Sequence, residues 1–347
     1  MLWSVVIPNW CGGAMVRRAV ASLLAEGRRE RARDARWTFE IVVVDDASPD
    51  GDGQALERDL VGVHQPEVRV IRRAVNGGFG ATVTDGVAAA RGAVLCLCNN
   101  DLVVQAGFFG GLLEPIVEAA GGLNGLLTGS ADATPPSTGC VVGTSARTED
   151  ARGHANHACM RGVWRGGRMH LHWRETALPG QAQGEPMETH FVQGGAAAIR
   201  ADVWHAVGGF DARFNPGYWE DYDLSHRLRA RGWRLLYTPA ARAFHLGSVS
   251  MKSRHGAGRV RDLQERNRLL FELIHAPRHQ AGWRQAAGVA RDVVVEWWSG
   301  GPFHLTRGLR LAAAMPPLTA PGRPDAARHG NDDLYPEQGV DGFVAVE

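Results

Sequence analysis

The first hundred residues alternate short, mostly apolar runs with segments of helical spacing, and this pattern constrains the fold most. Strands that are apolar on both faces and separated by helices form a mostly parallel sheet covered by helices on both sides. The fold class is therefore α/β with a Rossmann-like sheet. In such a sheet ligands bind beyond the carboxyl ends of the strands. The predicted strands are Trp3–Ile7, Phe39–Val44, Val68–Ile71 and Ala93–Cys98.

Composition narrows the class of protein. Hydrophobic residues make up 44% of the 347 residues, enough for a large core, and the net charge of +1 gives no field that would favour nucleic acid. Five scattered cysteines do not form a disulfide framework and fit a reducing compartment. No uninterrupted apolar run is long enough to cross a bilayer. We therefore expect a cytoplasmic protein that is soluble or peripheral at the inner face of the membrane.

The rest of the chain is organised less regularly. Residues 121–138 are predicted as a flexible loop, and residues 139–200 show only weak strand signals. Helices are expected at Asp202–Val207, Trp219–Arg231 and Val260–Ile274, with a strand at Trp233–Thr238. We expect a main domain over residues 1–275, with halves at 1–120 and 139–275. A helical extension over 276–315 and a disordered tail over 316–347 follow.

Polar side chains end three of the first four predicted strands. Asn9 follows the first strand, Asp45 and Asp46 follow the second, and Asn99 to Asp101 follow the fourth. A carboxylate after the second strand can accept the N3–H of a uracil or thymine ring, or a ribose hydroxyl. The alternative is that Asp46 and Ser48 only cap the next helix.

Three further features suit a diphosphate. Asp101 is placed to bind a divalent cation, which a diphosphate leaving group requires, although an Asx turn is the simpler reading. The glycine-rich turn Asn76–Gly80 opens a helix, where backbone N–H groups can face phosphate, or it is only a tight turn. His245 follows the last strand. If His245 faces the same pocket as Asp101, its imidazole completes the cation site; otherwise it is an ordinary satisfied histidine.

Three acids crowd the start of the helix predicted at Trp219–Arg231. Glu220, Asp221 and Asp223 are favoured there by the helix dipole alone. The functional alternative is that Asp221 is a general base that takes a proton from an acceptor hydroxyl. The aromatic residues Tyr218 and Trp219 would then offer a stacking surface for a sugar.

Taken in order, these segments resemble glycosyltransferase family 2, which has the GT-A fold, and most closely its rhamnosyltransferase-like branch. The similarity extends from residue 4 to about residue 270, and it is the ordered set of motifs that is specific. The matching segments are Ile7–Trp10, Asp45-Asp46, Asn76–Gly80, Asn99–Asp101, Gly194–Arg200, Gly208–Asp211, Glu220–Asp223 and His245–Ser248.

The resemblance implies a role for each matching residue. Asp221 would be the catalytic base with Glu220 beside it, and Asp101 and His245 would hold Mg²⁺ or Mn²⁺. The acceptor would lie against Gly194, Gly195, Tyr218 and Trp219. The donor nucleotide would be bound by Pro8, Asn9, Asp45, Asp46, Asn76, Gly78 and Asn100.

Three positions depart from the family pattern, and one of them is Thr84, which replaces a frequent asparagine in the helix after the glycine-rich turn. Cys11 stands where asparagine is usual. Asn99 replaces the first aspartate of the DxD motif, so cation binding depends more on Asp101 and His245.

The expected reaction is inverting transfer of a sugar from a dTDP or UDP donor to a hydroxyl of a glycan, a lipid-linked molecule or a small molecule. Rhamnose is favoured by resemblance only. A nucleotidyltransferase that makes nucleotide sugars is one alternative. It should carry a basic glycine-rich loop after the first strand, and here no basic residue precedes Arg17. A non-catalytic carbohydrate-binding relative is another alternative.

Two further segments leave alternatives open. His154, His157, Cys159, His170 and His172 are either zinc ligands or loop residues near the acceptor. A helical face in the extension either sits on a membrane surface, packs against the catalytic domain or forms a homodimer. That face is made of Trp283, Ala287, Ala290, Val294, Trp297 and Trp298.

Overall fold

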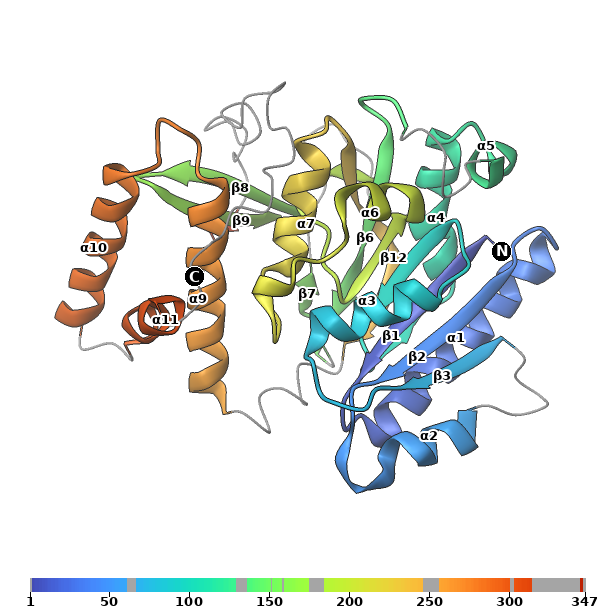
Figure 1. Ribbon diagram of the computed structural model, residues 1–347. Coiled ribbons are helices and arrows are strands. Elements are labelled where there is room, and N and C mark those ends of the chain that lie inside the picture. Colours follow the sequence, from blue (N-terminus) through green and yellow to red (C-terminus); the bar gives the residue numbers. More distant parts are fainter. Residues whose placement is uncertain are drawn as a thin grey trace.

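The computed structural model describes residues 2–60, 67–128, 136–150, 152–157, 159–174, 184–245, 256–299, 303–313 and 344–345. A large sheet crosses the molecule, with helices on both faces (Figure 1). The order along its main path is β10-β12-β6-β11-β4-β1-β2-β3, with β5 paired to β12 and β7 to β6. The strands are β1 (Trp3–Asn9), β2 (Phe39–Asp45), β3 (Val68–Arg72), β4 (Val94–Cys98), β5 (Leu102–Val104), β6 (Val141–Glu149), β7 (Ala155–His157), β10 (Met187–Glu188), β11 (Ala196–Arg200) and β12 (Arg234–His245).

Most strands of the main path run in one direction. The pairs β4–β1, β1–β2, β2–β3 and β6–β12 are parallel, whereas β11 is antiparallel to both β4 and β6. One reversed strand, β11, therefore joins the two halves of the sheet. It also brings the amino end of β11 to the edge where β4 ends. This mixed α/β sheet confirms the predicted fold class.

Two apolar layers hold the helices against the sheet. α1 (Gly13–Arg33), α2 (Asp52–Leu60) and α4 (Phe108–Ala119) pack on one face around Trp3, Phe39 and Phe109. α3 (Phe79–Ala89), α6 (Ala201–Val207) and α7 (Glu220–Arg229) cover the other face. Every residue of β2 and β4 is buried, as strands between two helical layers must be.

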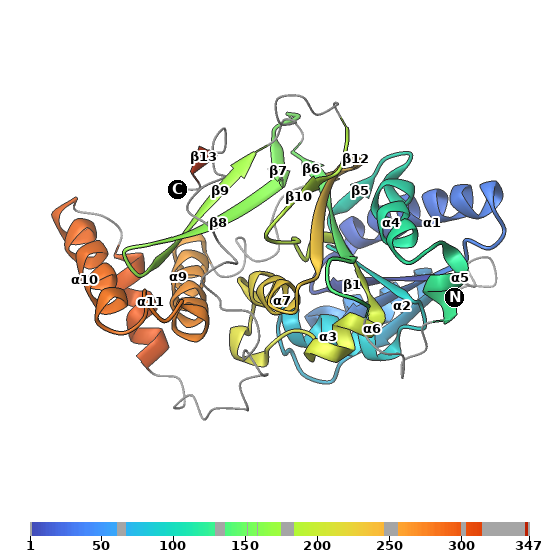
Figure 2. The same cartoon turned by 90° about the horizontal axis from the view of Figure 1, so that it is seen from above.

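A second, smaller sheet and three helices extend the molecule on one side (Figure 2). The hairpin β8 (Cys159–Arg165) and β9 (Arg168–Arg174) packs against α9 (Ala257–His275) through Trp164 and Phe271. α10 (Trp283–Trp298) and α11 (His304–Ala313) follow. None of the helices in the described ranges is both long and apolar enough to span a membrane.

Some expectations are corrected. The segment 121–138, predicted as a loop, contains the short helix α5 (Leu123–Thr128). The weak strand signals over 139–200 correspond to six strands in the described residues, β6 to β11, and four of them, β6, β7, β10 and β11, belong to the main sheet. Most of the tail 316–347 lies outside the described residues, but β13 (Val344–Ala345) pairs with β9.

Candidate active site

A row of polar side chains joins the carboxyl ends of β2, β1 and β4. The Asn9 amide donates to Asp45 Oδ1 at 3.0 Å, and Asn9 Oδ1 accepts from Asn100 Nδ2 at 2.9 Å. Asp45 also accepts from the Ser48 hydroxyl at 2.6 Å and is 1% exposed. The expectation that Asp45 binds the donor therefore needs correction. Its carboxylate is already used to fix the strand ends.

Asp46, the next residue, is held by a different set of donors. Its carboxylate accepts from Arg73 Nη1 at 2.6 Å and from the amides of Gly77 and Gly78 at 2.9 Å each. These two amides of the glycine-rich turn were expected to face a diphosphate, and they bind Asp46 instead. Gly78 has a φ of +81°, and a Cβ there would lie 2.6 Å from the Pro216 carbonyl oxygen, so only glycine fits.

Asp101 and His245 lie side by side although 144 residues separate them in the chain. The antiparallel pairing of β5 with β12 sets His245 opposite Leu102. As a result, Asp101 Oδ1 lies 3.1 Å from His245 Nε2, and both side chains are almost fully buried. This is the juxtaposition that the cation-site hypothesis required.

Asp221 lies at the start of α7, with both carboxylate oxygens hydrogen-bonded to backbone. Oδ2 accepts from the Gly194 amide at 3.0 Å, and Oδ1 accepts from the Tyr222 amide at 2.9 Å. Burial raises the pKa of Asp221 to about 6, although these amides oppose the rise. The group is therefore mostly ionised at neutral pH and has the higher proton affinity that suits a general base.

Glu220 is the more deeply buried of the two neighbouring acids. Burial, together with the adjacent Asp221 charge, raises the pKa of Glu220 well above its ordinary value. Among the described residues, its Oε2 atom has no hydrogen-bond partner, and neither does Oε1 of Gln193. Both residues line the cavity described below, so two buried polar atoms are available to ligand hydroxyls.

The loop that leads into α7 is clamped by α9. The Asn267 amide nitrogen lies 2.7 to 2.8 Å from the carbonyl oxygens of Phe214, Gly217 and Tyr218. Tyr218 and Trp219 both adopt a positive φ, of 76° and 69°, in this loop. Trp219 is turned into the core against Phe271 and does not line the cavity, which corrects its expected acceptor role.

One cavity of about 330 Å³ gathers the remaining predicted site residues from both halves of the sheet. Asp101, His245 and Asp221 share it, so the cation-site pair and the acidic helix start face one space. Asp45 and Trp219 are the two predicted residues that do not reach it. The predicted residues along its wall are Pro8, Asn9, Asp46, Asn76, Gly78, Asn100, Asp101, Gly194, Gly195, Tyr218, Glu220, Asp221 and His245.

Strained backbone surrounds the same cavity. Of the five non-glycine residues described with positive φ, four lie in or beside the cavity wall. Such conformations cost free energy and tend to collect at functional sites. The four are Cys11, Ala47, Tyr218 and Trp219.

Sequence reasoning missed several contributors. Thr82 and Tyr222 line the cavity, and Arg73 and Asn267 support it from behind. Tyr222 lies inside the acidic motif and could have been included. Arg73 and Asn267 act through contacts between elements distant in sequence, for which no local pattern exists.

Two other expectations concern the end of the His245 motif and the proposed zinc ligands. Gly247 and Ser248, which complete the His245 motif, lie outside the described residues. Across the described residues no group of three or more histidine, cysteine, aspartate or glutamate side chains is arranged to hold a metal ion, so the zinc hypothesis gains no support. Asp101 and His245 thus supply two protein ligands at most.

Comparison with known proteins finds a family model that matches the N-terminal part of the chain. The model of "Glycosyl transferase family 2" matches residues 4–134, a segment that holds Asp46 and Asp101. Residues 4–134 are thus similar to glycosyl transferase family 2. The family 2 segment ends before β6, so Asp221 and His245 lie outside the matched range.

One sequence relative and one solved structure show what the chain is similar to over a longer range. The uncharacterized protein y4gI of Sinorhizobium fredii is 27% identical over 72% of this chain and 25% of its own length. The crystal structure of GalNAc-T7 with UDP, GalNAc and Mn²⁺ superposes with a TM-score of 0.56 and 18% identity, over 77% of this chain and 47% of that chain. The shared architecture is the GT-A fold. The chain spans a quarter of the first relative and about half of the second.

Proposed function

We propose that this protein is an inverting glycosyltransferase that moves a sugar from a nucleotide-diphosphate donor to an acceptor hydroxyl. The observation that carries the proposal is the single cavity shared by the Asp101–His245 pair and by Asp221. The similarity of residues 4–134 to family 2 supports the reaction class. The donor we favour is a dTDP or UDP sugar, with rhamnose the first sugar to test.

The acceptor side supplies the proton chemistry. Asp221 takes the proton from the acceptor hydroxyl as that oxygen forms a bond to the anomeric carbon. The bond from this carbon to the diphosphate breaks in the same step, and the diphosphate keeps the electron pair. A single displacement with one base inverts the anomeric centre, unlike a mechanism with a carboxylate nucleophile. The Gly194 amide keeps the Asp221 carboxylate oriented.

The donor side fits a divalent cation. Asp101 and His245 offer one carboxylate and one imidazole, a donor set that suits Mn²⁺ or Mg²⁺ when phosphate oxygens complete the coordination. When bound, such a cation neutralises charge on the departing diphosphate. Asn9, Asn100 and Asp46 lie on the neighbouring wall, where a nucleotide would extend.

The acceptor is a hydroxyl of a glycan, a lipid-linked molecule or a small molecule. The unpartnered Oε2 of Glu220 and Oε1 of Gln193 favour a hydroxyl-rich ligand, because each needs a hydrogen bond once water is excluded. Burial raises the pKa of Glu220, which favours the neutral form of its carboxyl more than in an exposed glutamate.

A donor panel tests the proposal. Wild type and Asp221→Asn are incubated with dTDP, UDP and GDP sugars, with and without Mn²⁺, and free nucleotide diphosphate is measured. We expect cation-dependent release by wild type and a loss of about a hundredfold or more in the variant, because the base is gone. The rate should rise with pH through about 6, where the Asp221 carboxyl loses its proton.

Asp202→Asn is the matched control, because Asp202 also begins a helix but binds only local groups among the described contacts, the Arg200 side chain and the Val203 amide. Equal rates for wild type and Asp221→Asn would remove Asp221 from the mechanism. Pyrophosphate released from a nucleoside triphosphate and a sugar phosphate would identify a nucleotidyltransferase. Donor binding without any release would identify a non-catalytic relative.

A further inference from the structure

The outer face of α10 holds five of the eleven large apolar side chains that are exposed among the described residues. Trp283, Val294, Val295, Trp297 and Trp298 are between 52% and 78% exposed. Figures 1 and 2 both place α10 at the end of the molecule farthest from the main sheet. Soluble proteins rarely leave such a contiguous apolar patch in water without a partner for it.

The inner face of the same helix is small and polar. Gln285 and Gly288 are its buried residues, and Asp292 and Glu296 continue that stripe at helical spacing. A Cβ on Gly288 would lie only 2.1 Å from the Gly166 carbonyl oxygen, so the β8–β9 hairpin tip fits closely against this face. An amphipathic helix normally buries its apolar stripe. α10 turns that stripe to the outside.

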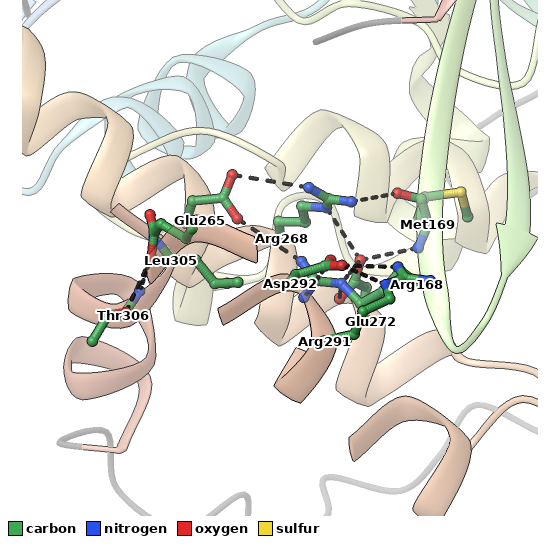
Figure 3. Close-up of polar contacts among 10 residues, drawn as sticks. Arg168, Met169, Glu265, Arg268, Glu272, Arg291, Asp292, Leu305 and Thr306 are labelled. Atoms are coloured by element: carbon green, nitrogen blue, oxygen red, sulfur yellow. Dashed lines mark hydrogen bonds and ion pairs between the residues drawn. The ribbon is translucent and has the colours of Figure 1, made fainter. Parts of the chain in front are cut away.

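Buried ion pairs fix α10 in this rotation. Figure 3 shows Arg168, from β9, between carboxylates of α9 and α10. Arg168 is fully buried; its Nε lies 2.9 Å from Glu272 Oε2, and its Nη1 lies 3.3 Å from Asp292 Oδ2. Rotating α10 to bury its tryptophans would leave Arg168 without Asp292.

The second acid of α10 is also turned inward. Glu296 accepts from the amides of Leu305 and Thr306, at 3.0 and 3.2 Å, where α11 begins. Residues 276–313 hold only these two acids. The largely exposed charges of the extension are basic, and they are Arg278, Arg284, Arg291, Arg307 and Arg310. Of these, Arg291 also pairs with the partly exposed Asp292 at 2.8 Å.

We propose that the outer face of α10 docks on the surface of an anionic lipid bilayer. Tryptophans at both ends of a helix, alanine and valine between them and arginines at the rim suit the boundary between headgroups and acyl chains. Negative lipid headgroups complement the arginines. The inference goes beyond the proposed function and does not depend on it.

The charges around the outer face of α10 also argue against a second copy of the chain as its binding partner. A two-fold dimer brings the same face of each chain together. Two such faces would oppose arginine to arginine with no exposed acid of the extension between them, which is unfavourable.

Vesicle flotation of the full chain tests the inference. The protein is mixed with vesicles of phosphatidylcholine alone or with added phosphatidylglycerol. We expect binding to the anionic vesicles, weakening as salt is raised, and a blue shift of tryptophan emission. Trp297→Ser with Trp298→Ser should weaken binding about tenfold or more, since both rings are largely exposed and their loss removes buried apolar area. Arg284→Glu with Arg310→Glu should reduce the anionic preference.

Leu127→Ser on α5 is the control, because Leu127 is 46% exposed on the opposite side of the molecule and should not affect binding (Figure 2). Equal vesicle binding by wild type and the double tryptophan variant would overturn the proposal. A dimer that dissociates in that variant, without vesicle binding by wild type, would assign the face to a second copy instead. Nucleotide release measured without vesicles reports on catalysis separately.

Discussion

At the residue scale, the acid that begins α7 is the most constrained group of the cavity. Asp221 is half-buried, and two backbone amides keep its carboxylate in place. Burial is the larger influence, and it raises the pKa to about 6. The folded protein therefore holds a proton on this group over a pH range in which the unfolded chain has lost it.

This difference predicts a stability effect. Between about pH 4 and 6 the folded state binds more protons than the unfolded state, so the wild-type free energy of unfolding falls as pH rises. Asp221→Asn removes that dependence. We expect the variant to melt at a higher temperature than wild type at pH 8, and the difference to shrink at pH 4.5. A difference that is the same at both pH values would contradict the assignment, and Asp202→Asn should show no stabilisation.

At the element scale, the start of α7 depends on contacts with α9, a helix that comes later in the chain. Asn267 of α9 is fully buried and contacts three carbonyl oxygens of the 214–218 loop, while Arg266 donates to two more, those of Arg213 and Asn215. The clamp holds the left-handed residues Tyr218 and Trp219 immediately before Asp221. α9 is thus a support for the site as well as a cover for the hairpin.

Asn267→Ala should reduce both stability and turnover. Removing the amide leaves buried carbonyl oxygens unsatisfied, at about 1–3 kcal/mol in the free energy of unfolding. Turnover should fall by more than donor affinity, because the loop positions Asp221 and not the Asn9–Asn100 wall. Urea unfolding and separate kcat and KM values check this. Gln264→Ala on the same helix is the control, and equal behaviour of the two variants would exclude the clamp.

Sequence pattern predicts some elements well and others poorly for a physical reason. β1, β2 and β4 are apolar on both faces, so their existence and their polar ends follow from the residues. β6 is equally central but contains Gly143, Thr144 and Ser145, which are not apolar. Such residues can be buried only where a partner satisfies their polar groups; the Thr144 hydroxyl, for example, donates to the Leu112 carbonyl oxygen. Asp45 and Trp219 do not line the cavity, because burial separates neighbouring residues that look alike in sequence.

At the scale of the whole molecule, a charged centre joins the hairpin to the C-terminal helices. Arg168 and Glu272 are both completely buried, and Arg268 adds a second contact to Glu272 at 3.2 Å (Figure 3). Buried ion pairs contribute specificity of packing more reliably than net stability. Here the pair sets how α9, α10 and the hairpin sit together.

Arg168→Met should therefore destabilise the protein strongly. The change leaves the buried Glu272 carboxylate short of one cation, and we expect a loss of about 3–5 kcal/mol in the free energy of unfolding. The double variant Arg168→Met, Glu272→Met should recover much of that loss, because no buried charge remains unpaired. Chemical unfolding of the wild type and of both variants gives the comparison. Additive losses in the double variant would show that the two residues do not act as a pair.

The reversed strand β11 has a consequence for anyone who would recombine this protein with a relative. The family 2 segment stops near residue 134, yet β4 inside it is flanked by β11, which comes from residues 196–200. A chimera spliced between positions 121 and 138 would take β4 from one parent and its hydrogen-bonded neighbour β11 from the other. The middle of the sheet would then have to form between strands of different origin. Segments of this protein would therefore have to be exchanged loop by loop, on a scaffold kept whole.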